Sequence, residues 1–238
     1  MPTYDDSIPI APQIAAFHAE EIEDFARPGT WLSGEERIAV VQATRNAREG
    51  AQLQSPVEHD AAPPEDVLPE AVLHLIERLA CRAETFERAV YEQARDAGIS
   101  DGEYVEIVSL VARIVNLDVI ARGMGTNALR FKAPVEGEPS CATPEAAVHE
   151  GAWLPTLPGD GSGGEAAADL YGGAMQPFIY RALSLVPHEA RRVMTGGNIQ
   201  YLTLDKFFDY SYSAHAGLTR AHVETVAARV SAINQCFY

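Results

Sequence analysis

Three residues near the end of the 238-residue sequence, His222, Glu224 and Cys236, have side chains that could take part in chemistry. A thiolate can attack a peroxide oxygen and become a sulfenic acid, which a second thiol converts into a disulfide. A glutamate or a histidine can move protons, either in that reaction or in acid–base catalysis without thiols. We therefore take Cys236, Glu224 and His222 as the candidate catalytic residues.

All three residues belong to one predicted helix, LTRAHVETVAARVSAINQCFY (218–238), whose valines and alanines recur at helical spacing. A similar segment, LSGEERIAVVQATRNAREG, occupies residues 32–50. Both segments open with Leu followed by Ser or Thr, and Gly50 stands in the first where Cys236 stands in the second. The pattern indicates two related helical modules.

These segments resemble the AhpD-like, carboxymuconolactone decarboxylase-like family, which includes alkylhydroperoxidase D and peroxidase-related proteins. The resemblance covers about residues 31–125 and 175–238 and is most specific over 217–238. It implies an AhpD-like helical bundle with Glu224 as a proton relay and Cys236 as the resolving, first cysteine of a Cys-x-x-Cys pair. It also implies a break between Glu224 and Cys236 that puts them on neighbouring helices.

The sequence departs from the family pattern at the positions that carry its chemistry. The second cysteine would directly follow Tyr238, and the first module has Ile38, Gly50 and Leu53 where the glutamate and the two cysteines would stand. The last apolar run ends without a Gly, a Pro or a polar cap, so we expect a longer natural chain with a truncated second module here.

The function that the resemblance implies is thiol-based reduction of organic hydroperoxides, an antioxidant oxidoreductase activity, with the second cysteine beyond residue 238. A thiol reductant protein would be its partner, and the helix over 103–124 would pack subunits into a homo-oligomer. Two alternatives stay open. One is a degenerate, non-catalytic member that acts in oligomeric assembly. The other is a cofactor-free decarboxylase or lactone-type enzyme that uses His222 or Glu224 in an apolar pocket.

The same residues also have structural interpretations. Cys236 could be an ordinary buried thiol, Glu224 could pair with Arg220 or Arg229, and His222 could cap its helix. The aromatic residues between 201 and 212 could pack in the core or line a pocket for an apolar substrate.

The predicted elements are helices, so the fold class is all-α. Residues 1–30 form an arm with one helix near 11–26, and residues 31–125 form the first module. A Pro- and Gly-rich linker follows over 126–170, and 171–238 begin the second module. The predicted helices after the arm are 32–53, one or two within 67–97, 103–124 in a core or a subunit interface, 175–185, 187–201, a helix or turn over 202–213, and the final segment. Ser33 with Glu36, and Ser100 with Glu103, have capping-box spacing and are expected to start the helices over 32–53 and 103–124.

Composition narrows the choice of partners. A net charge of −16 and a pI of about 4.8 argue against nucleic acid and anionic membrane surfaces. The sequence has no apolar run long enough to span a bilayer and no signal-peptide pattern, so we expect a cytoplasmic protein. Cys81, Cys141 and Cys236 have no zinc-site spacing, the histidines form no HExxH-type pair, and the Gly-rich stretches lack the context of a phosphate loop, so we expect no metal or cofactor. The resemblance implies a small hydroperoxide or another apolar molecule as substrate.

Overall fold

The computed structural model describes residues 4, 10–57, 67–172, 176 and 178–236. Within these residues the regular structure is helical, and an isolated antiparallel bridge joins Val148 to Thr156. The all-α prediction is confirmed, and no helix in the described part is both long enough and apolar enough to cross a bilayer. The helices are α1 (Pro12–Phe25), α2 (Gly34–Gly50), α3 (Glu70–Cys81), α4 (Arg88–Asp96), α5 (Asp101–Met124), α6 (Gly164–Tyr171), α7 (Phe178–Arg181), α8 (Pro187–Gln200) and α9 (Arg220–Ile233), with short 3₁₀ turns η1 (Ala83–Thr85) and η2 (Leu204–Lys206).

Helices α2 and α5 both begin at the capping boxes that their sequences predict. The Glu36 side chain accepts a hydrogen bond from the Ser33 N–H at 2.8 Å, and the Ser33 hydroxyl accepts one from the Glu36 N–H at 3.3 Å. Ser100 and Glu103 repeat this exchange at the start of α5, at 2.7 and 3.2 Å. Each box gives hydrogen-bond partners to N–H groups that a helix start otherwise leaves unpaired.

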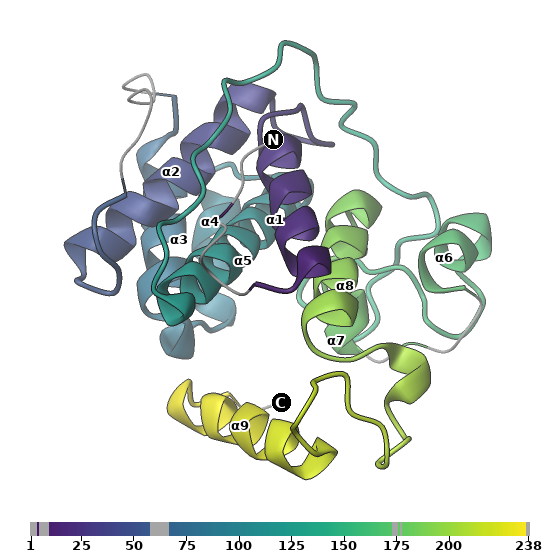
Figure 1. Ribbon diagram of the computed structural model, residues 1–238. Helices are drawn as coiled ribbons and strands as arrows, with labels where there is room; N and C mark the ends of the chain where they lie inside the picture. Colours follow the sequence, from purple (N-terminus) through teal and green to yellow (C-terminus); the bar gives the residue numbers. More distant parts are fainter. Residues whose placement is uncertain (1–3, 5–9, 58–66, 173–175, 177, 237–238) are drawn as a thin grey trace.

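Helix α5 lies at the centre of the bundle and packs against α2, α3 and α8 (Figure 1). Val105, Ile107, Leu110 and Ile114 are fully or almost fully buried along it. Of the two predicted environments for residues 103–124, a core or a subunit interface, the structure shows the core. Most of the apolar surface of this helix is therefore used within the chain.

The predicted helix bounds over 67–97, 175–185 and 202–213 agree only in part with the structure. Residues 67–97 contain two helices, α3 and α4, separated by η1. The helix expected over 175–185 is described only as the single turn α7, and residues 173–175 and 177 lie outside the described residues. Residues 202–213 form η2 and turns.

The predicted linker over 126–170 is partly a packed element of the fold. Its irregular first part crosses the α1–α2 connection, where the Val135 N–H donates to Ala26 O and the Cys141 N–H donates to Thr30 O, both at 2.7 Å. Its end forms α6, which the linker prediction did not include. A small second core joins this region to α8, made of Leu157, Ala167, Leu170, Tyr171 and Ala190.

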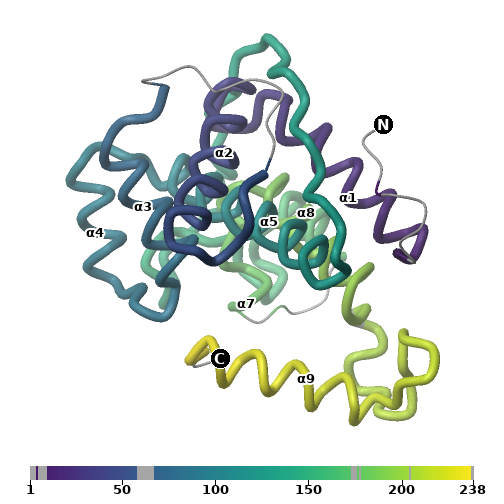
Figure 2. Tube along the Cα trace, turned by 60° about the vertical axis from the view of Figure 1, so that its left-hand side comes forward, coloured from purple at the N-terminus to yellow at the C-terminus, as the bar shows by residue number. Residues whose placement is uncertain are grey.

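Helix α9 lies apart from the bundle in both views (Figures 1 and 2). Its Val226, Val230 and Ile233 are 65%, 50% and 61% exposed. Helix α2, its predicted counterpart, is instead packed against α3 and α5. The two helices share a capped start and differ in their surroundings, so the repeat of two modules stays a prediction.

The aromatic residues before α9 do not pack in the core as predicted. Phe208 is 80% exposed and Tyr210 73% exposed, and Phe207 meets Phe208 edge to face at 5.1 Å between ring centroids. These rings lie in turns without a helix to cover them, which is why the prediction of core packing is wrong.

Candidate functional site

Cys236 carries an exposed thiol in no disulfide. It follows the end of α9 at Ile233, and Gln235 before it has a left-handed backbone with φ of 52°. The interpretation of Cys236 as an ordinary buried thiol is therefore wrong. The side chain is accessible to a reagent in solution, which thiol chemistry requires.

Two side chains hold the Glu224 carboxylate: Arg220 at the start of α9, and Tyr201, which directly follows α8. It accepts hydrogen bonds from the Arg220 guanidinium and from the Tyr201 hydroxyl, the latter at 2.8 Å. These bonds, the one from Arg220 first, hold the pKa of Glu224 below its usual value. Of the two predicted partners, Arg220 and Arg229, the structure shows the first.

His222 is exposed and caps its own helix. Its backbone N–H donates to the Thr219 hydroxyl and its ring Nδ1 accepts from the Thr219 N–H, both at 3.3 Å. This geometry confirms the capping interpretation.

Glu224 and Cys236 are not brought together within the chain. Helix α9 is continuous from Arg220 to Ile233, so the break implied by the family resemblance is absent from this stretch. Nine residues of helix, from Glu224 to Ile233, rise about 14 Å. A proton relay from Glu224 to Cys236 of the same chain therefore has no direct path along this helix.

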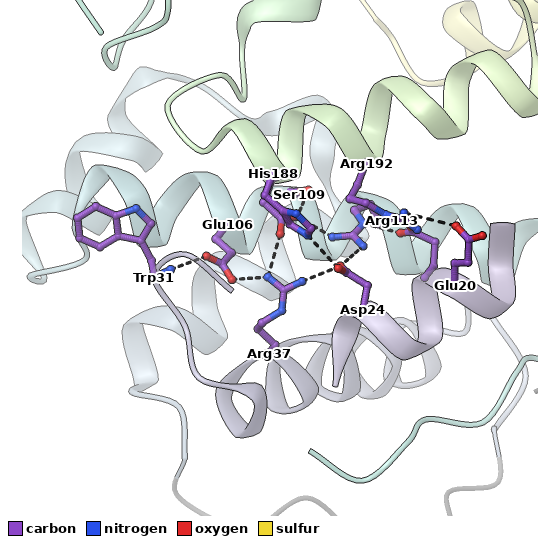
Figure 3. Close-up of polar contacts among 11 residues, drawn as sticks. Glu20, Asp24, Trp31, Arg37, Glu106, Ser109, Arg113, His188 and Arg192 are labelled. Atoms are coloured by element: carbon purple, nitrogen blue, oxygen red, sulfur yellow. Dashed lines mark hydrogen bonds and ion pairs between the residues drawn. The ribbon is translucent and has the colours of Figure 1, made fainter. Parts of the chain in front are cut away.

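A larger group of ionisable side chains lies between α1, α2, α5 and α8 (Figure 3). We call it the buried charge network. It combines three guanidiniums with four carboxylates, together with a serine and a histidine. Its members are Arg37, Arg113, Arg192, Glu21, Asp24, Glu106, Glu189, Ser109 and His188.

Glu189, at the start of α8, joins two of these arginines. One carboxylate oxygen accepts from Arg37 Nη1 at 2.8 Å, and the other accepts from Arg113 Nη1 and from the Ser109 hydroxyl, both at 2.6 Å. Burial alone would raise the pKa of Glu189, but Arg113 and Arg37 outweigh it and hold the pKa at about 2. Glu189 is therefore charged although it is fully buried.

Asp24 connects the same arginines to the surface. Its Oδ2 accepts from Arg37 Nη2 at 2.9 Å and from Arg113 Nη2, and its Oδ1 lies 2.8 Å from Nε2 of the half-exposed His188. Burial opposes ionisation of Asp24, but the His188 hydrogen bond and the two guanidiniums outweigh it and place the pKa far below the usual range. The network thus reaches the protein surface at His188.

For Glu106, on α5, the effect of burial on the pKa outweighs that of the neighbouring donors. It accepts from Arg37 Nη1 and from the Trp31 N–H, the latter at 2.8 Å. Desolvation raises the pKa of Glu106 in spite of these two donors. A Cβ on Gly29 would lie 1.7 Å from the Glu106 Oε1 atom, so only glycine leaves room for this carboxylate.

Sequence reasoning missed the buried charge network, although a signal was present. Glu106 and Arg113 are charged positions inside the otherwise apolar run of α5, seven residues apart and hence on one helix face. Charges that must enter a core need partners of opposite charge there. Which acids of α1 and α8 supply those partners depends on how the helices pack, and no local pattern encodes that packing.

The geometry of the network is that of ion pairs more than of a metal centre. Ligand atoms of Asp24, His188 and Glu189 lie within 4.8 Å of one another. The same carboxylates already bind Arg37 and Arg113, whose positive charges would repel a divalent cation. We therefore assign the network to the packing of four helices.

Comparison with known proteins does not place the chain in a family. No family model matches it, no curated protein matches it, and no solved structure matches it.

Proposed function

We propose that this protein takes part in thiol-dependent reduction of organic hydroperoxides, with Cys236 as the resolving thiol. The observation that carries the proposal is the exposed, unpaired Cys236 at the end of the segment that resembles the AhpD-like family. Cys81, which ends α3, is partly buried, and Cys141 lies in the segment that bonds to Thr30. The reaction also requires an attacking thiol, for which the resemblance implies a second cysteine directly after position 238.

The proposed reaction has two steps. The attacking thiolate bonds to one peroxide oxygen, the O–O bond breaks, and the alcohol leaves after taking up a proton. The resulting sulfenic acid then condenses with the Cys236 thiol, which forms a disulfide and releases water. A thiol reductant returns two electrons and regenerates both thiols.

The test uses Cys236→Ser and, as the matched control, Cys141→Ser, because both cysteines are exposed and free. Each protein is mixed with tert-butyl hydroperoxide and free cysteine, and mass spectrometry follows the mixed disulfide. Free cysteine stands in for the attacking thiol, so we expect its mixed disulfide to form on Cys236 faster than on Cys141, and the total mixed disulfide to fall clearly in Cys236→Ser and little in Cys141→Ser. Equal rates of mixed-disulfide formation on Cys236 and Cys141 would overturn the proposal.

A further variant, Glu224→Gln, examines the relay that the resemblance implies. Because α9 separates Glu224 from Cys236, we expect the rate of iodoacetamide alkylation of Cys236 to stay unchanged. A clear fall in that rate would show that Glu224 reaches the thiol, for example from a second copy of the chain.

A second candidate function, oligomeric assembly without catalysis, is favoured by the exposed apolar side chains of α9, Val226, Val230 and Ile233. Size-exclusion chromatography with light scattering tests it, with Val226→Gln/Val230→Gln as the variant. Val119→Gln is the control, because Val119 is equally exposed on α5. A monomeric parent, or an oligomer that the α9 variant does not weaken, would rule out assembly through α9.

A further inference from the structure

A cavity of about 300 Å³ lies between α1, α5 and α8, and Glu21, Arg113 and Arg192 of the buried charge network are among the residues that line it. Its walls are largely apolar, with Phe17 from α1, Leu117 from α5 and Val193 from α8. The cavity opens to solvent beside Val193, and its volume has room for a substituted aromatic ring or a molecule of similar size.

Two consecutive glycines of α8, Gly196 and Gly197, line the cavity. A glycine inside a helix costs about 0.5–1 kcal/mol relative to alanine, so a pair needs a reason. At Gly196 the reason is packing, since a Cβ would lie 3.0 Å from the Phe17 ring. At Gly197 no atom lies within 4 Å of the Cβ position, so packing does not require glycine there. Gly197 is exposed where it lines the cavity, and the space next to its Cβ position is open.

The charges at the cavity floor are already paired. Glu21 accepts from the Arg113 and Arg192 guanidiniums, and the remaining nitrogens of Arg113 hold Glu189 and Asp24. The Arg192 Nη2 atom lies beside Glu21 but makes no hydrogen bond, so it can donate one to an acceptor oxygen of a ligand while its charge stays paired. An ionised ligand would instead have to compete with these buried ion pairs for a partner of opposite charge. The floor therefore favours an uncharged molecule.

One polar group at the cavity is held in a fixed orientation. The Gln200 amide lies 2.8 Å from Nε2 of His18, and the Tyr4 hydroxyl lies 2.6 Å from Nδ1 of the same ring. His18 is fully buried, and burial lowers its pKa to about 4, so the ring is neutral at pH 7. This chain of hydrogen bonds orients an amide that can bind one polar end of a ligand.

We propose that this cavity binds a small, uncharged and mainly apolar molecule that carries one carbonyl or ester group. Phe17, Leu117 and Val193 enclose its apolar part, and Gln200 meets its polar end. The site is separate from Cys236 and does not depend on the proposed peroxide chemistry.

Three probes that share a benzene ring test the class of ligand by isothermal titration: methyl benzoate, benzoate and benzylamine. We expect methyl benzoate to bind the full chain, and benzoate and benzylamine to bind more weakly or not at all. No binding of methyl benzoate, or tighter binding of either charged probe, would overturn the proposal.

The location is tested with Gly197→Leu, which places a side chain in the cavity. Gly123→Leu is the matched control, because Gly123 is also an exposed helical glycine with no atom near its Cβ position and lies outside the cavity. We expect methyl benzoate affinity to fall about tenfold or more in Gly197→Leu and to stay unchanged in Gly123→Leu. Equal affinity in both variants would place binding elsewhere and reject this cavity.

Two further variants keep the result interpretable. Gly197→Ala should raise the melting temperature, because alanine favours helix, and should weaken methyl benzoate binding less than leucine does. Cys236→Ser should bind methyl benzoate like the parent, so a failure of the thiol proposal and a failure of the cavity proposal give different results.

Discussion

Glu189 shows how strongly the stability of the protein can depend on one residue of the buried charge network. Its two oxygens accept from Arg37, Arg113 and Ser109, and it is fully buried. The stabilising effect of such a buried pair over an apolar pair is small or negative, but removing one partner leaves uncompensated charge in a dry interior. Loss of the carboxylate is therefore much more damaging than a count of hydrogen bonds suggests.

We expect Glu189→Ala to lower the free energy of unfolding by about 3–5 kcal/mol, since two guanidiniums lose their shared partner. Urea unfolding measures the change. Glu92→Ala is the control, because the Glu92 pair with Arg88 is exposed on both sides and such pairs contribute about 1 kcal/mol at most. A cost for Glu189→Ala no larger than that of the control would contradict the structure.

His18 makes stability depend on pH. Burial lowers its pKa from 6.5 to about 4, so between these values the unfolded chain binds more protons than the folded one. Stability is then lost as the pH falls through this window. From pH 7 to pH 5 the loss due to His18 is about 2 kcal/mol.

In His18→Gln this part of the pH dependence should disappear, as seen by urea unfolding at both pH values. His74→Gln, at an exposed histidine, should keep the slope of the parent. If His18→Gln and the parent lose the same stability between pH 7 and pH 5, then His18 is not buried in its neutral form.

At this scale the sequence predicted local contacts and missed distant ones. The capping role of His222 and the pairing of Glu224 with Arg220 involve neighbours within four residues, and both follow from helical spacing. The partners of Arg113 are 76 to 92 residues away in the chain. Such partners depend on how helices pack, which spacing within one helix does not specify.

Helices α2 and α9 show at the scale of an element how surroundings change the meaning of one motif. Each begins with a Ser or Thr capping box, but α2 is packed in the bundle and α9 is exposed along its apolar side chains. A cap stabilises the helix that it starts. Whether it stabilises the whole protein depends on the coupling of that helix to the core.

We therefore expect different outcomes from two matched variants. Ser33→Ala should destabilise the protein by about 1 kcal/mol and lower the melting temperature, because α2 folds with the core. Thr219→Ala should reduce the far-ultraviolet helical signal and leave the melting temperature of the bundle unchanged. Equal falls in melting temperature would show that α9 unfolds together with the bundle.

Helices with capping boxes were also the elements whose positions the sequence predicted best. Helices α2 and α5 begin at Ser33 and Ser100 as predicted, since local hydrogen bonds define their starts. Helix α6 was missed within the Gly-rich segment, because its burial comes from contact with Ala190 of α8. The turns over 202–213 have aromatic residues without the spacing that would identify a buried face.

For the whole molecule, the buried charge network and the apolar core join α1, α2, α5 and α8 into one body, while α9 stands outside it. A region with few buried contacts opens without global unfolding. We expect the backbone amides of α9 to exchange hydrogen for deuterium within seconds to minutes, and those of α5 to exchange only through global unfolding.

Hydrogen exchange followed by mass spectrometry measures this difference peptide by peptide. Mild urea should speed exchange in α5 and leave α9 unchanged, because α9 already exchanges through local opening. Protection of α9 equal to that of α5 would contradict this expectation and would mean that α9 is covered, for example by another copy of the chain.

The spread of the buried charge network along the sequence has a consequence for how the protein is made. Synthesis begins at the N-terminus, so Arg37 and Arg113 leave the ribosome long before Glu189. Until α8 follows, both guanidiniums lack one of their carboxylate partners, and the nascent bundle of α1, α2 and α5 has water where Glu189 will lie. The emergence of α8 is therefore the step at which the nascent chain can first exclude that water and close its interior.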